Sequence, residues 1–96
     1  MNKQLVITGA QVKYFKTDFR AGSISLVCVP ASATYSVAYT CTPHSFADSA
    51  KNWVAISAGL TGATTSQTAE TGSITGLRFT LTSGTSLTVD MCQAEA

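Results

Sequence analysis

Short runs of alternating apolar and polar residues recur along most of the chain, and this alternation constrains the fold more than any other feature. The runs are rich in Val, Ile, Thr, Tyr and Phe, and Gly, Pro, Ser or Asn separates them. Because successive side chains of a strand point to opposite faces, such runs predict β-strands with one buried face. No segment has the spacing of a convincing amphipathic helix. The sequence therefore predicts an all-β fold, an antiparallel and jelly-roll-like β-sandwich of about seven or eight short strands.

The expected strands follow from these runs and cover residues 3–8, 11–16, 22–29, 34–41, 52–57, 72–75, 76–82 and 86–92. The stretches 42–52 and 60–72 lack the alternation, and we expect both to be loops. A chain of 96 residues has room for one domain, so residues 1–96 are expected to form a single β-sandwich domain. Residues 1–20 either join this sandwich or form an extended arm.

The C-terminal runs predict a hairpin, because a register slip of one residue would place apolar side chains opposite polar ones. A three-residue loop at 83–85 sets Leu81 opposite Leu87 and keeps the apolar faces together. The same register places Arg78 opposite Asp90 on the outer face, as a pair of opposite charges.

A second hairpin is predicted upstream by the same reasoning. With a four-residue loop at 30–33, Cys28 lies opposite Tyr35 and the neighbouring apolar residues pair in turn.

Composition argues against several functional classes. The formal net charge is +1 and the six basic residues are scattered, whereas binding to nucleic acid needs clustered Lys and Arg. The N-terminus lacks the apolar run of a secretory signal, and no run is long enough for a membrane span. We therefore expect synthesis in a reducing cytoplasm. The three cysteines lack CxxC spacing, which disfavours disulfides and zinc and predicts buried free thiols.

Candidate catalytic residues are sparse. His44 is the only histidine, and its sequence neighbours Cys41, Ser45 and Asp48 share one loop with it. Adjacent loop residues seldom reach the geometry of a nucleophile and its base, so a solvent-facing histidine is the favoured interpretation. The carboxylates form no evident acid and base pair, and no metal or phosphate motif is present. We predict no enzymatic activity, no catalytic residue, no cofactor and no metal.

Trp53 is the one residue for which a functional role competes with a structural one. A single Trp in a β-sandwich can stack on a sugar, anchor a protein interface or simply pack. In the run Trp53 to Ser57, Trp53 points outward if Val54 and Ile56 point into the core. Both a partner contact and plain packing remain open.

Several tracts in about the last sixty residues resemble a family of short virion proteins from tailed bacteriophages. The tracts are YTCTPHSF at 39–46, NWV at 52–54, GSITGLRFTLTSG at 72–84 and LTV at 87–89, followed by Gln93. Members of that family often carry two acidic residues before the proline, where this chain has Cys41 and Thr42 before Pro43. Any role of those acids is therefore not transferred to this chain.

The resemblance implies a capsid decoration or cement protein that binds the assembled phage head, so that the chain would reside in the virion. Its partners would be the major capsid protein or other virion proteins, and it would be a homo-oligomer, a dimer or trimer, with neither nucleic acid nor membrane bound. We expect Trp53, Phe46, Thr64 and Thr65 to contact the partner. The alternatives are a tail or head-tail accessory protein, and a small carbohydrate-binding module that stacks sugars on Trp53 with Tyr35 or Tyr14.

Overall fold

The computed structural model describes residues 1–94, which form one antiparallel sheet with short 3-10 helices in its connections. The strands are β1 (Asn2–Thr8), β2 (Gln11–Lys16), β3 (Ile24–Thr40), β4 (Val54–Ala55), β5 (Gln67–Thr71) and β6 (Gly76–Gln93). The 3-10 helices are η1 (Phe19–Ala21), η2 (Asp48–Ala50) and η3 (Ala58–Leu60). The prediction of an all-β antiparallel fold is confirmed, whereas its jelly-roll detail stays a prediction. No helix within residues 1–94 is long and apolar enough to cross a membrane.

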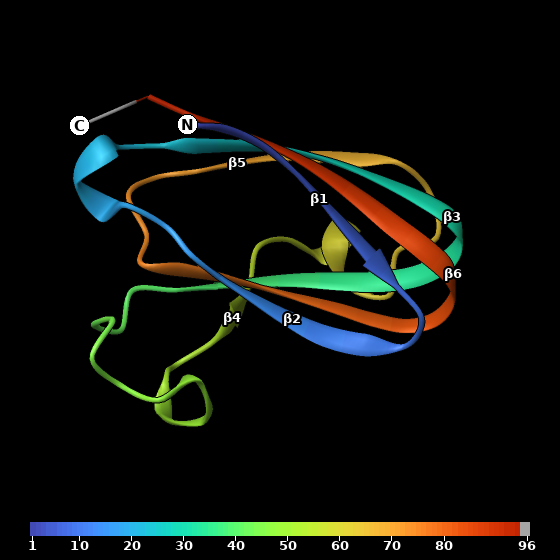
Figure 1. Cartoon of the computed structure of the whole chain (residues 1–96), viewed down its shortest axis with the longest axis horizontal. Coiled ribbons are helices and arrows are strands. Elements are labelled where there is room, and N and C mark those ends of the chain that lie inside the picture. Colours follow the sequence, from blue (N-terminus) through green and yellow to red (C-terminus); the bar gives the residue numbers. More distant parts are fainter. Residues whose placement is uncertain (95–96) are drawn as a thin grey trace.

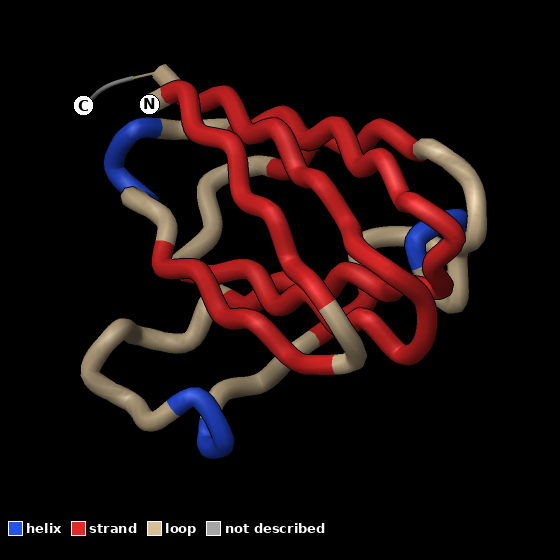
Figure 2. The backbone as a smooth tube through the Cα atoms, turned by 45° about the vertical axis from the view of Figure 1, so that its right-hand side comes forward, coloured by secondary structure: helices blue, strands red, loops and turns tan. Residues whose placement is uncertain are grey.

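Two long strands, β3 and β6, form the centre of the sheet. They pair in antiparallel register from Ile24 opposite Gln93 to Thr40 opposite Gly76, with an irregularity between Thr34 and Tyr35. Both strands bend near the middle, and the whole ladder turns back on itself at the right of Figure 1. The sheet therefore has two halves that face each other, as Figure 2 shows.

Each half is completed by two shorter strands. In the first half, β1 pairs with the C-terminal part of β6, and β5 pairs with the N-terminal part of β3. In the second half, β2 pairs with the N-terminal part of β6, and β4 pairs with the C-terminal part of β3. Residues 2–8 and 11–16 thus belong to the sheet. They do not form the extended arm that was one of the alternatives.

Both predicted hairpins are wrong. Leu81 lies opposite Tyr35 and Leu87 lies opposite Pro30, so each expected pair of strands is one bent strand that pairs with the other bent strand. The alternation determines which face of a strand is buried but not which strand lies beside it. A bend that folds the ladder over buries the same side chains as a hairpin reversal would.

Other strand boundaries also differ from the expected ones. The expected strand at 72–75 is absent, and the expected strand at 52–57 is reduced to the two residues of β4. Residues 67–71, which were expected to lie in a loop, form β5 at the edge of the first half. Its side chains are half-buried or exposed, which explains why it lacks the apolar residues that would have revealed it.

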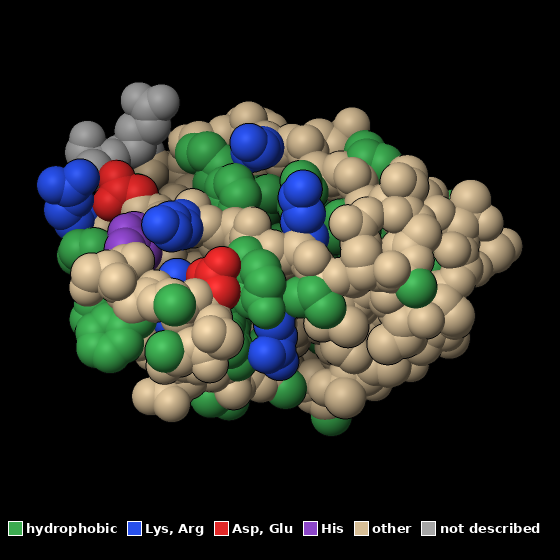
Figure 3. All heavy atoms as spheres, turned by 60° about the horizontal axis from the view of Figure 1, so that its bottom comes forward, with side chains coloured by type: hydrophobic (Ala, Val, Ile, Leu, Met, Phe, Trp, Pro, Cys, Tyr) green, Lys and Arg blue, Asp and Glu red, His purple; other side chains and the backbone are tan. Residues whose placement is uncertain are grey.

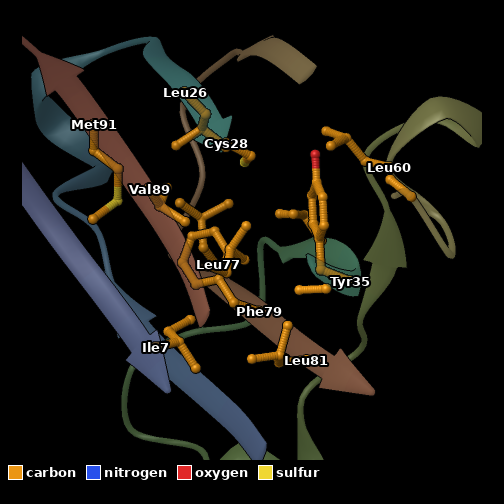
Figure 4. Close-up of a cluster of buried hydrophobic side chains, with 14 of the residues drawn as sticks. Ile7, Leu26, Cys28, Tyr35, Leu60, Leu77, Phe79, Leu81, Val89 and Met91 are labelled. Atoms are coloured by element: carbon orange, nitrogen blue, oxygen red, sulfur yellow. The ribbon is translucent and has the colours of Figure 1, made fainter. Parts of the chain in front are cut away.

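The core lies between the two halves (Figure 4). Alternate residues of β3 and β6 point into it, so the predicted inward faces of these segments are correct. Its largest fully buried side chains are Tyr35, Phe79, Ile7, Ile24, Leu26, Leu60, Leu77, Leu81, Leu87, Met91, Val37 and Val89. The hydroxyl of Tyr35 reaches the far side of this core and donates a 2.8 Å hydrogen bond to the carbonyl oxygen of Thr65.

The open end of the fold is closed by polar contacts around Gln93. The buried side-chain amide of Gln93 donates 3.0 Å hydrogen bonds to the carbonyl oxygens of Asp18 and Gly22. The backbone of Met1 also pairs with the backbone of Gln93. These contacts connect the end of β6 to η1 and to the start of β1.

Candidate interaction surface

Tyr14, Trp53 and Arg78 form a cluster on the outer surface of the second half. We call these three side chains the aromatic face. The Tyr14 and Trp53 rings lie 5.5 Å apart between centroids and are inclined by 45°. The guanidinium carbon of Arg78 lies 5.4 Å from the centroid of the Trp53 ring, within the range of a cation–π contact.

The strand register explains why these residues meet. Tyr14 of β2 lies directly opposite Arg78 of β6, and both point away from the core. Trp53 comes from the connection before β4, and its indole nitrogen donates a 2.9 Å hydrogen bond to the carbonyl oxygen of Asp48. The indole reaches β6 at Gly76, where a Cβ atom would lie 3.5 Å from the Trp53 ring, an ordinary van der Waals distance.

Trp53 thus lies over the outer surface of the sheet, as the outward alternative assumed, but for a different reason. That alternative assumed that Val54 points into the core, yet Val54 is 54% exposed. Ile56 is half-buried and packs against the core. Because β4 has only two residues, the connection around it, and not strict alternation, sets the orientation of Trp53.

The predicted pair between Arg78 and Asp90 is wrong. Arg78 lies in the second half, whereas Asp90 lies in the first half, where its carboxylate accepts a 2.9 Å hydrogen bond from the side chain of Gln4. No carboxylate of residues 1–94 lies within ion-pair distance of Arg78. Its Nε atom is shielded from solvent and has no hydrogen-bond partner among the described residues.

A shallow hollow of about 320 Å³ begins beside Arg78. Its other lining residues are small or carry hydroxyl groups: Ser36, Val37, Ala38, Ala55, Thr61 and Thr80. The hydroxyl oxygen of Ser36 accepts a 2.9 Å hydrogen bond from the backbone of Gly62, which positions the loop after η3 at the rim. A cationic group, two aromatic rings and several hydroxyl groups therefore share one surface.

Phe46, the second predicted contact residue, is 52% exposed but does not belong to the aromatic face. It lines a separate hollow of about 600 Å³ beside the 41–52 segment, together with Tyr39, Pro43 and Val54 among others. Trp53 is not among the residues that line this hollow.

Thr64 and Thr65 are exposed and lie in the connection between η3 and β5. They follow Ala63, which forms a bridge with Tyr35 close to the bend of β3. The structure therefore does not unite the four predicted contact residues at one site. No residue from Ala21 to Ala47 is Asp, Glu, Lys or Arg. On the face that Figure 3 shows, charged side chains are scarce at the end where the strands bend.

The Nε2 atom of His44 contacts a backbone carbonyl oxygen. His44 is half-buried, and its Nε2 lies 2.8 Å from the carbonyl oxygen of Thr75 while the Phe19 ring packs edge-on against it. The nearby Asp18 accepts a hydrogen bond from the backbone N–H of Arg20, which lowers the pKa of its carboxyl group below the usual value. Residues 1–94 contain no group of three side chains placed to bind a metal ion.

Only one cysteine matches the prediction of buried free thiols. Cys28 is buried in the core, and burial raises the pKa of its thiol to about 11, which keeps it in the unreactive protonated form. Cys41 and Cys92 are free but exposed, so the prediction is wrong for these two. Cys92 points away from the core because it alternates with the buried residues Met91 and Gln93 on β6.

Comparisons with protein-family models, with curated proteins and with solved structures found no match for this chain. The site is therefore defined by its own geometry. Sequence reasoning singled out Trp53 and mentioned Tyr14, but it assigned Arg78 to another partner. The alternation of each segment places Tyr14 and Arg78 on outward faces. This indicates a shared site only when β2 is known to lie beside β6.

Proposed function

We propose that this chain is a non-enzymatic structural protein that binds another protein through its aromatic face. The observation that carries the proposal is the packing of Tyr14, Trp53 and Arg78 on one outer surface. Tyr, Trp and Arg are the residue types most enriched among those that dominate binding energy at protein interfaces. Tyr14, Trp53 and Arg78 are suited to binding a partner, and none of the three is arranged as a nucleophile or a general base.

The specific form that we propose is a decoration or cement protein of a phage head, in keeping with the sequence resemblance. A protein that binds only the assembled shell stabilises that shell by mass action, and this role needs exposed contact surfaces without catalytic groups. Low charge and many Ser and Thr residues suit a surface that is covered in a symmetric assembly. A tail or head-tail accessory protein would use the same surface on a different component.

Co-sedimentation with phage particles tests this proposal. Heads and tails are separated from a lysate of the strain that encodes the chain, and mass spectrometry measures the chain in each fraction. Purified chain is then titrated against expanded heads. We expect saturable binding to heads, whereas exclusive recovery with tails would favour the accessory role. Absence from both fractions, together with no binding to heads, would rule out a virion function.

Substitutions on the aromatic face connect this binding to the proposed surface. Trp53→Ala and Tyr14→Ala should each weaken association by more than about 1 kcal/mol. Tyr14 is 42% exposed on an edge strand, so its substitution leaves the core intact. Phe19→Ala is the matched control, because Phe19 is a similarly exposed aromatic residue of η1 outside the cluster. Equal effects of all three substitutions would argue against the aromatic face.

One observation favours a carbohydrate-binding module as a second candidate. Tyr14 and Trp53 are neighbours with partly open rings, an arrangement on which a sugar can stack. The alternative pairing of Trp53 with Tyr35 is wrong, because Tyr35 is fully buried. Binding on a glycan array that Tyr14→Ala abolishes would support this candidate, and an array without hits would dismiss it.

A further inference from the structure

The charge of Arg78 has no counter-charge within residues 1–94. The two ion pairs of this region are Asp18 with Arg20 at 3.4 Å and Asp48 with Lys51 at 2.9 Å. The carboxylate closest in sequence to the Trp53 segment, Asp48, is thus already engaged by Lys51. A partly buried guanidinium without an anion has lost part of its hydration. The attraction of the indole ring compensates for only part of this lost hydration free energy.

The position of Arg78 leaves room for an anion from outside. Its Nε atom is enclosed, while its side chain lines the hollow that Ser36 and Thr80 share. The planar fork of a guanidinium matches the two oxygens of a carboxylate, and a hydroxyl-lined hollow can supply further hydrogen bonds. The Trp53 ring lies beside the guanidinium and limits its freedom, so less conformational entropy is lost when an anion binds.

The surrounding charges favour an acidic partner. Lys16 lies on the same outer side of β2 as Tyr14 and is exposed, so it adds a second positive charge to this side of the second half. The carboxylates of Asp90 and Glu70 are exposed on the first half. Complementary charge across an interface guides association and selects partners. The partner surface that fits the aromatic face is therefore acidic.

We infer that the protein that docks on the aromatic face inserts an Asp or Glu carboxylate beside Trp53, where Arg78 binds it. This inference rests on the proposed function and specifies the chemistry of the partner. Trp53 and Tyr14 contact the apolar part of the acidic side chain and its neighbours, and the guanidinium receives the carboxylate. Arg78 is then the residue that distinguishes an acidic partner surface from a neutral one.

A peptide titration tests the inference directly. Trp53 is the only tryptophan, so the ¹⁵N-labelled chain gives a single indole N–H signal that reports on the site. The probes are acetyl-Gly-Glu-Gly-amide and its Gln counterpart at equal ionic strength. We expect a saturable shift of the indole signal with the Glu peptide and at least tenfold weaker binding of the Gln peptide.

Two variants separate recognition at Arg78 from general charge effects. Arg78→Met keeps much of the packing volume and should abolish the response to the Glu peptide. Lys13→Met removes one positive charge from β2 and should change the affinity less than twofold. A response that survives in Arg78→Met, an equal response to the Gln peptide, or no response to either peptide would overturn the inference. Digalacturonate is titrated in parallel, and saturation by this acidic sugar alone would also overturn it.

The particle assay distinguishes failure of the inference from failure of the proposed function. If Trp53→Ala and Tyr14→Ala weaken binding to heads but Arg78→Met does not, the inference is wrong and the adhesive function stands. If the chain does not bind particles at all, the proposed function is wrong, while the peptide titration still decides whether Arg78 recognises carboxylates. We expect the chain to bind heads and the Glu peptide to bind at Arg78. Arg78→Met should weaken binding to heads at least tenfold.

Discussion

A Cβ atom added at Gly84 would lie 2.0 Å from the backbone oxygen of Ser32, so the bends of β6 and β3 touch without space for a side chain. Gly84 has φ +110°, a conformation that other residues rarely adopt. Ser32 has φ 49° at the matching bend of β3. The folding-over of the sheet therefore depends on the close approach of these two residues.

Gly84→Ala should destabilise the fold by about 3 kcal/mol or more, because the methyl group meets backbone atoms that cannot move aside and the conformation itself is strained. Urea unfolding followed by circular dichroism measures this loss. Gly72→Ala is the matched control, since a Cβ atom there meets nothing within 4 Å. We expect Gly72→Ala to change the free energy of unfolding by less than about 1 kcal/mol. A tolerated alanine at position 84 would contradict the proposed contact.

Alkaline pH should destabilise the protein through two buried groups. Burial raises the pKa of Cys28 from 9.0 to about 11, and burial together with Cys28 raises the pKa of Tyr35 from 10.0 to about 12. Between the two values the unfolded chain has released a proton that the folded chain still holds, so rising pH favours unfolding. The stability is fully present below pH 9 and is lost progressively as the pH rises towards 12.

Tyr35→Phe isolates the contribution of tyrosine to this pH dependence. At pH 7 the variant loses the hydrogen bond to Thr65 and should be less stable by about 1 kcal/mol. Above pH 10 it should lose stability less steeply than the parent, because one of the two ionising groups is gone. Urea unfolding at a series of pH values provides the measurement. Parallel curves for parent and variant would show that Tyr35 does not contribute.

The pair of Asp48 and Lys51 should respond unequally to loss of its two partners. The side chain of Lys51 is only 1% exposed, whereas that of Asp48 is 40% exposed. Asp48→Asn leaves a buried ammonium group without its counter-ion and should destabilise by about 2 kcal/mol. Lys51→Met removes the buried charge itself and should destabilise by less than about 1 kcal/mol. Thermal unfolding of both variants decides the matter, and the reverse order would refute this account.

Gln93 should be sensitive to substitution although it is a polar residue near the end of β6. Gln93→Leu leaves the partly buried carbonyl oxygens of Asp18 and Gly22 without their donor, so we expect a loss of about 2 kcal/mol. Hydrogen exchange should also show faster opening of η1 than in the parent. Cys92→Leu, at the exposed neighbouring position, is the control and should leave exchange in η1 unchanged. Equal exchange rates in the two variants would contradict the role of Gln93.

Alternation predicted the buried faces of β3 and β6 correctly, because it depends only on the local geometry of a strand. It could not predict that Leu81 lies opposite Tyr35, since a hairpin reversal and a folded ladder bury the same side chains. Ser83 and Gly84 indicate that the chain changes direction, both in a hairpin reversal and in a bent strand. The choice between the two depends on pairing between segments about fifty residues apart, which no local pattern records.

The same limit applies to the aromatic face. Trp53 was singled out by its residue type, but its neighbours Tyr14 and Arg78 come from β2 and β6, whose adjacency is not visible in either segment. The expected hairpin gives Arg78 a counter-charge in Asp90 that it lacks among residues 1–94 of the structure. A single error in strand pairing thus concealed the most informative electrostatic feature of the surface.

The central place of β6 has a consequence for the biosynthesis of the protein. β6 is the partner of β1, β2 and β3, so none of these earlier strands has its full set of neighbours until residues 76–93 have left the ribosome. The nascent chain therefore carries unpaired strands until β6 has been translated. We expect it to fold only after β6 emerges, and chains interrupted before β6 to be substrates for chaperones and proteases.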